Sequence, residues 1–234
     1  VYAFPMKYNI YGIMINKDHL DEAGLPVPTD WTWDDYREYA KQLTTEDRYG
    51  SYLHTWATLF DTLMLFNKPK EHLLIKADGS SNMEDPLVRS SLQLRYDLES
   101  VDKSSEPYAN IISQKLNYRQ QFFTGKASMV PIPTYMLTEW GGFTPDFKIA
   151  WAPWPKNNAD DPQYRFASAD VIALGKNSDH KEEAYKFNRW MSTEGMLVQN
   201  KFIPAWKDVN ITEVLGDLAA NTSNPDAVDI ESLA

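Results

Sequence analysis

Aromatic side chains are the feature of this sequence that points most directly to ligand chemistry. The 234-residue chain contains 8 Trp, 13 Tyr and 10 Phe. Large aromatic rings commonly fill protein cores, but 8 tryptophans are more than we expect a core of this size to need. Flat rings suit the apolar faces of sugars, while nearby Asn, Asp and Ser side chains suit sugar hydroxyl groups. We therefore expect some of these rings to face a bound carbohydrate.

Carboxylates are plentiful, and one of them stands in an unusual place. Asp34 and Asp35 fall at a predicted helix start, where the helix dipole favours negative charge. Asp170, in contrast, interrupts an apolar run soon after Ser168. Two interpretations stay open for it: a carboxylate at a strand end often satisfies a turn, and it also accepts hydrogen bonds from a sugar hydroxyl. A glycosidase would need two facing carboxylates, and nothing in the sequence indicates such a pair.

Several other kinds of chemistry have no support in the residues. The chain has no cysteine, which excludes disulfides, thiolate metal sites and cysteine nucleophiles. It contains no glycine-rich phosphate loop and no nucleophile elbow. We predict no catalytic residue, no metal site and no cofactor, and we expect the four histidines to be surface or helix-end residues: His19, His54, His72 and His180. The net charge of −10 repels phosphates, so nucleic acid is not an expected partner.

Strand and helix patterns alternate along the chain. Tyr11, Ile13 and Ile15 alternate within an extended run over 3–15. Further patterns predict strands at 49–53, 127–132, 147–151 and 169–174, and helices at 17–23, 33–43, 56–66, 86–98, 118–123 and after Ser178, the last with Ala184, Phe187 and Met191 on one face. The alternation is irregular, which predicts an α/β fold with mixed rather than purely parallel sheets.

Short strings along most of the chain resemble those of a known family. They are Tyr11-Gly-Ile-Met-Ile-Asn-Lys-Asp18, Glu22-Ala-Gly-Leu-Pro26, Phe122-Phe-Thr-Gly-Lys-Ala-Ser-Met129, Ala152-Pro-Trp-Pro155 and Lys181-Glu-Glu-Ala-Tyr-Lys-Phe187. In this order and spacing, they resemble the extracellular solute-binding proteins of ABC importers, in the sugar-binding, maltose-binding-protein-like branch. The resemblance covers about residues 3 to 208.

The resemblance implies a periplasmic-binding-protein-like fold of two α/β lobes with mixed sheets, and ligand held between the lobes. It also implies a partial chain that lacks most of the N-terminal lobe. Residues 1–9 would be a hinge strand and N-lobe remnant, and 10–166 the C-terminal lobe. Residues 167–204 would be an N-lobe fragment, and 205–234 helices that return to the C-terminal lobe.

The same resemblance implies candidate ligand contacts by position. They are Tyr8, Asn9, Trp56, Thr134, Tyr135, Ser168 and Asp170. Tyr135 stands where the family usually has the Trp of a Gly-Pro-Trp element, so the assignment departs from the family pattern, although Tyr also stacks on sugars. For Trp56 and Tyr135 the alternative is simple core packing.

The implied function is a substrate-binding receptor that captures a sugar or oligosaccharide and delivers it to the permease subunits of an ABC transporter. The resemblance implies no enzyme activity, a monomer, and an extracytoplasmic location, either periplasmic or as a cell-surface lipoprotein. Three alternatives stay open: a carbohydrate-active hydrolase, a binding protein for a non-sugar solute, and an interaction domain whose aromatic residues all lie in the core.

Overall fold

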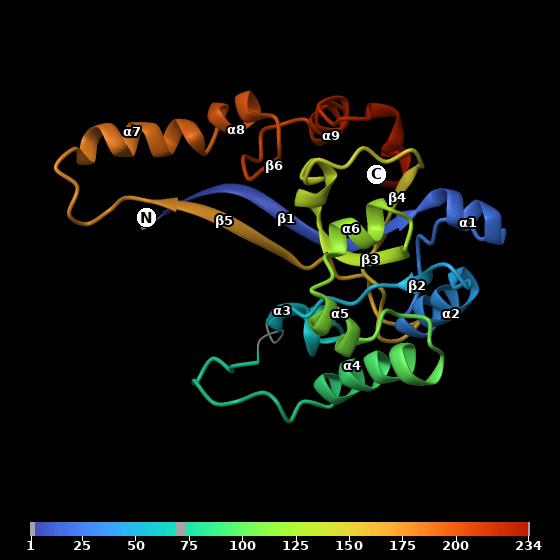
Figure 1. Ribbon diagram of the computed structural model, residues 1–234. Coiled ribbons are helices and arrows are strands. Elements are labelled where there is room, and N and C mark those ends of the chain that lie inside the picture. Colours follow the sequence, from blue (N-terminus) through green and yellow to red (C-terminus); the bar gives the residue numbers. More distant parts are fainter. Residues whose placement is uncertain (1–2, 69–73, 234) are drawn as a thin grey trace.

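The fold is organised around one long strand that belongs to two sheets. The computed structural model describes residues 3–68 and 74–233. Strand β1 (Ala3–Asn16) pairs along its first half, antiparallel, with β5 (Ala167–Ala173) and β6 (Ile203–Pro204). Figure 1 shows β1 and β5 running side by side from the N-terminal end toward the main body of the molecule. The predicted strands at 3–15 and 169–174 are confirmed.

The second half of β1 lies in the other sheet. It pairs antiparallel with β3 (Ala127–Pro133) on one side and β4 (Ile149–Pro153) on the other. Strand β2 (Tyr49–Ser51) adds to β3 in parallel. This sheet is therefore mixed, as predicted. The change of partner falls between Ile10, opposite Ala167, and Tyr11, opposite Pro133.

Two helices after β1 begin and end where their sequences predict. Helix α1 (Lys17–Ala23) ends at Gly24, whose φ of 68° is the left-handed conformation that glycine adopts without strain. Helix α2 (Trp33–Leu43) starts with a capping box, in which Thr32 and Asp35 each bond to the other's backbone N–H.

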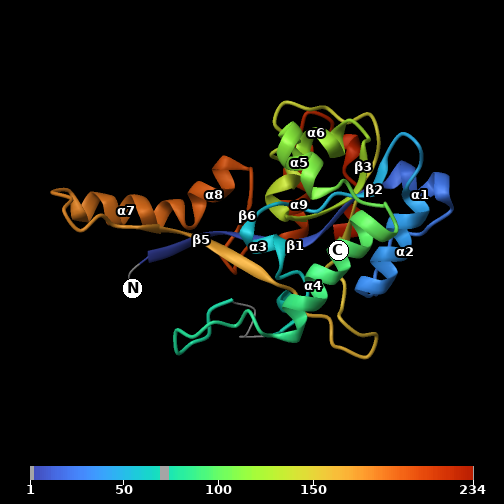
Figure 2. The same ribbon diagram turned by 60° about the horizontal axis from the view of Figure 1, so that its bottom comes forward.

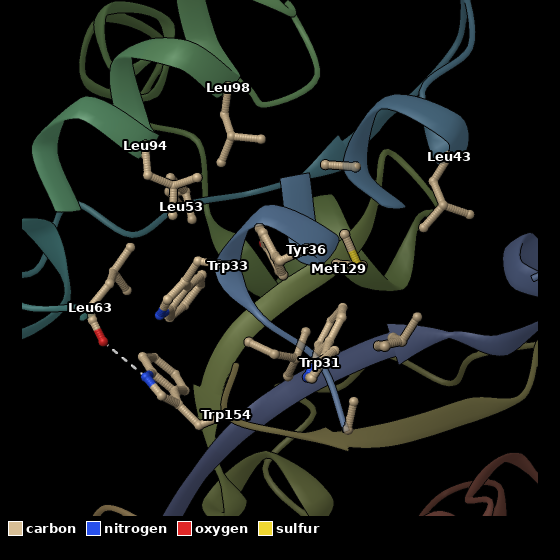
Figure 3. Packing of buried hydrophobic residues seen from close by; sticks show 14 of the residues in the cluster. Trp31, Trp33, Tyr36, Leu43, Leu53, Leu63, Leu94, Leu98, Met129 and Trp154 are labelled. Carbon is tan, nitrogen blue, oxygen red and sulfur yellow. Dashed lines mark hydrogen bonds between the residues drawn. The ribbon is translucent and has the colours of Figure 1, made fainter. Parts of the chain in front are cut away.

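Most of the tryptophans are core residues, and for the three others a contact with ligand stays a prediction. Five of the eight are buried: Trp31, Trp33, Trp140, Trp151 and Trp154. Figure 3 shows Trp33 and Trp154 within the larger core cluster, with the Trp154 indole N–H donating to the Leu63 carbonyl at 2.9 Å. This core buries the predicted inner face of α2 against the sheet.

The helix predicted over 56–66 is wrong. The segment holds only α3 (Ala57–Phe60) and a 3₁₀ turn at Leu65–Asn67. Tertiary partners take the backbone groups that a continuous helix would have paired. The Leu63 carbonyl accepts from Trp154, and the Met64 N–H donates to Ser91 Oγ at 3.0 Å.

Three of the remaining helices fall where their patterns predict a helix: α4 (Pro86–Tyr96), α6 (Tyr118–Phe123) and α7 (Lys181–Met191). The sequence patterns did not individually predict α5 (Tyr108–Gln114), α8 (Glu194–Gln199) and α9 (Ile211–Ala220). Downstream of α9, the chain returns to β4, where the Asp229 N–H donates to the Ile149 carbonyl at 2.9 Å. Within the described ranges, no helix has the length and apolar character needed to span a membrane.

The apolar face predicted on α7 is not buried. Phe187 is 55% exposed, and the buried residue of α7 is Asn188. Figures 1 and 2 show α7 and α8 beside β5, set apart from the main body. Exposed apolar side chains of these elements include Val171, Tyr185, Phe187, Trp190, Leu197 and Val198. An amphipathic helix normally buries such a face, and no part of the described chain covers this one.

Candidate functional site

The point where β1 changes sheets is fixed by a side chain from the neighbouring strand. The Ile10 N–H donates to Thr134 Oγ1 at 3.0 Å. Thr134 is buried and opens the 3₁₀ turn Thr134–Leu137 that directly follows β3. The bond therefore ties the turn carrying Tyr135 to the crossover of β1.

Four side chains form what we call the aromatic cluster: His54, Trp56, Tyr118 and Tyr135. The His54 and Trp56 rings stack with centroids 4.1 Å apart, and Tyr118 meets Trp56 edge-on at 5.2 Å. The Tyr118 and Tyr135 hydroxyls are hydrogen-bonded at 3.1 Å. Tyr118 thus links Trp56 and Tyr135, the two aromatic residues that the resemblance singled out, although these lie far apart in the sequence.

The rings of the aromatic cluster lie between core and solvent. Trp56, Tyr118 and Tyr135 are each half-buried, whereas His54 is only 2% exposed. Trp56 packs against both large core clusters, and Tyr135 packs against one of them. Each of these two rings therefore supports the core and also keeps surface that a ligand can contact.

The side chains of the cluster are uncharged, and the guanidinium of Arg119 lies beside two of its rings. Burial, followed by the Tyr118 hydrogen bond, raises the pKa of the Tyr135 hydroxyl, so this group stays protonated. The Arg119 guanidinium lies 4.9 Å from the Tyr118 ring centroid and 5.9 Å from that of Tyr135. Its counter-charge is Glu139 at 3.6 Å. Neutral ring faces with hydroxyl groups at their edges suit a neutral, hydroxyl-rich ligand better than an ionic one.

The prediction that all histidines lie at the surface or at helix ends is wrong for His54. Burial holds the pKa of its imidazole down to about 3, so the ring is neutral. His19 lies in α1, where burial lowers its pKa to about 4 and Nδ1 lies 2.9 Å from Ser128 Oγ. His180 is exposed at the N-cap of α7, and His72 lies outside the described residues.

The candidate contacts on β1 and β5 do not all share one face. Asn9 lies opposite Ser168 in the antiparallel pair, so these two side chains point to the same side. Tyr8 directly precedes Asn9 on β1. Successive side chains of a strand alternate between its two sides, so Tyr8 points to the other side. Asn9 is buried, and its side-chain oxygen has no hydrogen-bond partner among the described residues.

Asp170 has a protein partner. Its carboxylate lies 3.2 Å from Lys7 Nζ, in the register position directly across β1. Lys7 Nζ also lies 3.5 Å from the centroid of the Phe202 ring. The side chain of Asp170 remains 49% exposed. The ion pair explains a carboxylate within an apolar strand without a ligand, and a ligand contact of Asp170 stays a prediction.

Several residues at the site were missed by sequence reasoning. Tyr118 and Arg119 sit at the start of α6, and no local pattern marks them as neighbours of Trp56. Lys7 could have been found, because pairing an extended 3–10 run with 167–173 places opposite charges across the strands. Among the described residues, no three His, Asp or Glu side chains gather closely enough to hold a metal ion.

Comparison with known proteins identifies the fold and the family. The chain resembles the ABC substrate-binding protein Lmo0181 from Listeria monocytogenes in complex with cycloalternan, at 23% identity and a TM-score of 0.74 over 99% of this chain and 59% of that one. A sugar transporter from Rhizobium etli in an open conformation has 21% identity and a TM-score of 0.72, covering 100% and 60%. UgpB from Mycobacterium tuberculosis in complex with glycerophosphocholine has 16% identity and a TM-score of 0.72, covering 95% and 58%.

These likenesses show a shared fold, the periplasmic-binding-protein fold, and the chain spans about three fifths of the length of each neighbour. No curated protein sequence matches the chain. The family model of the bacterial extracellular solute-binding proteins matches residues 2–198. The chain therefore belongs to the bacterial extracellular solute-binding proteins.

Proposed function

We propose that this protein is the receptor of an ABC importer, which binds a sugar or oligosaccharide between two lobes and delivers it to the permease subunits. The observation that carries the proposal is the half-buried aromatic cluster beside the point where β1 passes from one sheet to the other. Stacking rings suit the apolar face of a sugar, and the hydroxyl groups at their edges suit the sugar hydroxyls. Asn9, whose buried oxygen has no hydrogen-bond partner in the part of the chain that the structure describes, adds an acceptor for a sugar hydroxyl.

The two sheets of β1 correspond, in this proposal, to the two lobes. Residues 1–9 and 167–204 belong to the N-terminal lobe, 10–166 to the C-terminal lobe, and 205–234 return to the latter. The exposed apolar face of α7 and α8 then belongs to an N-terminal lobe of which this chain carries only a part. The coverage of about three fifths of each structural neighbour supports a lobe that is present only in part.

The neighbours support a sugar as the first ligand class to test. One of them is described in complex with cycloalternan and another as a sugar transporter. A third is in complex with glycerophosphocholine, which keeps a non-sugar solute as the alternative. We propose that the protein is monomeric, extracytoplasmic as a periplasmic or lipid-anchored receptor, without nucleic-acid partners and without enzymatic activity.

Binding by such a receptor needs no bond-breaking chemistry. A ligand that contacts both lobes favours the closed arrangement by its difference in affinity for the open and closed states. Around the β1 crossover, Thr134 fixes the Tyr135 turn to the strand itself, so a change in strand geometry reaches the aromatic cluster directly.

The test is a thermal-shift and calorimetric screen of the protein as it occurs in its full-length form. The panel contains neutral mono- and oligosaccharides, with glycerophosphocholine as the non-sugar arm. A ligand that binds only the folded state raises the unfolding midpoint. We expect Trp56→Ala and Tyr135→Ala to weaken sugar binding about tenfold or more, as loss of a binding hot spot does. Tyr96→Ala is the matched control, because Tyr96 is 59% exposed on α4.

Each outcome bears on a different alternative. Unchanged affinity in both cluster variants, with folding intact, would show that the rings are only core residues. Sugar breakdown during the screen would favour the hydrolase. Binding of glycerophosphocholine without any sugar would favour the non-sugar receptor.

A further inference from the structure

A buried arginine lies beneath the segment that presents Trp56. Arg95 of α4 is only 4% exposed, and its guanidinium is enclosed by the chain between β2 and α3. We propose that Arg95 is a positioning residue for Trp56: its guanidinium holds residues 53–60 from both ends and so fixes the ring offered to the ligand. This inference rests on the proposed function for its effect on binding, but not for its effect on Trp56 itself.

The first hold is on the backbone before Trp56. Arg95 donates to the His54 carbonyl at 2.7 Å and to the Leu53 carbonyl at 3.3 Å. Hydrogen bonds from a charged donor are roughly twice as strong as neutral ones. Because the His54 ring stacks on the Trp56 indole, fixing the His54 backbone also orients the surface on which Trp56 rests.

The second hold is on the ring after Trp56. The Arg95 guanidinium lies 4.4 Å from the centroid of the Phe60 ring, a cation–π distance. Phe60 in turn meets Tyr108 edge-on at 5.3 Å. A guanidinium offers in-plane donors and a flat face at once, so one group binds carbonyls on one side and a ring on another. The ammonium of a lysine cannot reproduce this pattern.

The segment itself supplies little rigidity. Helix α3 has four residues, and its N-cap, Trp56, makes no side-chain capping bond. Isolated helices of this length are unstable, so the conformation depends on outside contacts. The Arg95 charge is compensated by Glu99 at 2.8 Å, and Glu99 also accepts from the Tyr108 N–H at 2.9 Å. The ion pair thus fixes the Arg95 guanidinium relative to α4 and α5 without leaving an unpaired buried charge.

The experiment follows Trp56 by ¹⁹F NMR of the full-length protein labelled with 5-fluorotryptophan. The Trp56 signal is assigned by its absence in Trp56→Phe. We expect Arg95→Lys to shift or broaden the Trp56 signal while the signals of core tryptophans such as Trp33 stay in place. Arg89→Lys, at an exposed arginine of the same helix, is the matched control and leaves the Trp56 signal unchanged.

A second variant keeps the test decisive if Arg95→Lys does not fold. Phe60→Leu removes the ring hold and retains the arginine, and it too must move the Trp56 signal. An unchanged Trp56 signal in whichever of these variants folds would overturn the inference. Sugar affinity is measured in parallel, with about a tenfold loss expected in Arg95→Lys. If the Trp56 signal moves but the unaltered protein binds no sugar, the positioning role of Arg95 is supported and the proposed function is wrong.

Discussion

Acid should destabilise this protein through one buried imidazole. His54 is 2% exposed, its Nε2 has no hydrogen-bond partner among the described residues, and burial lowers its pKa from 6.5 to about 3. A hydrogen bond with the backbone of Pro131 opposes this shift but does not cancel it. The folded state therefore keeps the ring neutral at a pH where the unfolded chain binds a proton.

The sign and size of this pH effect on the free energy of unfolding follow from the linkage between proton binding and folding. Below pH 6.5 the unfolded state takes up a proton that the folded state refuses, so the free energy of unfolding falls as the pH falls toward about 3. One pKa unit corresponds to about 1.4 kcal/mol. The unfolded ring is half protonated at pH 6.5, so lowering the pH from 6.5 to 5 should cost about 1.7 kcal/mol through His54 alone. Above about pH 7.5 the ring is neutral in both states and contributes almost no pH dependence.

The assay is urea denaturation followed by circular dichroism at several pH values between about 4.5 and 8, a range chosen around the unfolded pKa of histidine. The unaltered protein is compared with His54→Asn, whose amide retains a donor but does not titrate. Other titrating groups contribute equally to both proteins, so the difference between the two slopes isolates His54. Any packing loss in the variant shifts its curve uniformly and leaves the slope unaffected.

As the pH is lowered, we expect the free energy of unfolding to fall more steeply in the unaltered protein than in His54→Asn, by about 1.4 kcal/mol per pH unit. The two slopes should coincide above about pH 7.5. Equal slopes over the whole range would refute the reasoning, because they would mean that the imidazole is protonated in the fold or reached by water.

Three further changes test the packing that supports the site. Thr32→Ala removes the capping box of α2 and should cost about 1 kcal/mol in urea denaturation. Tyr36→Phe leaves the buried Ser51 hydroxyl without its 2.6 Å partner and should cost about 1–3 kcal/mol, much of it recovered when Ser51→Ala is added. Gly50→Ala would place a Cβ 1.9 Å from the Ala40 carbonyl oxygen, so we expect a loss of about 2 kcal/mol or more in the same assay.

Each of these has a result that would contradict it. An unchanged urea midpoint in Thr32→Ala would show that the cap contributes nothing to stability. Additive losses in the Tyr36 and Ser51 double variant would mean that the two hydroxyls are not coupled. A fully stable Gly50→Ala protein would show that α2 and β2 are less tightly apposed than the structure has them.

Local patterns were enough to determine many elements. Helix α1 ends at Gly24 and α2 begins after Thr32, because capping and left-handed backbone conformations are properties of a few adjacent residues. The irregular alternation of strands and helices was enough for a mixed α/β fold. Strings in a family order predicted membership in the solute-binding proteins, which the family match confirms.

Tertiary structure decided what the single residues do. The helix predicted over 56–66 is interrupted because Trp154 and Ser91, distant in sequence, bond its backbone groups. Most tryptophans proved to be core residues. The number of tryptophans in a sequence does not say which of them the fold buries. Asp170, suggested as a ligand contact, faces Lys7 because antiparallel pairing places the two opposite each other.

The sequence by itself therefore determined the family, many of the elements and, through the family resemblance, the positions of Trp56 and Tyr135 as candidates. Only the folded chain brought His54, Tyr118 and Arg95 to them, through ring stacking, a hydroxyl pair and a buried guanidinium. The physical reason is the range of the interactions. Helix caps and strand alternation act between neighbours along the chain, whereas a binding surface is assembled from contacts whose sequence separations no local pattern records.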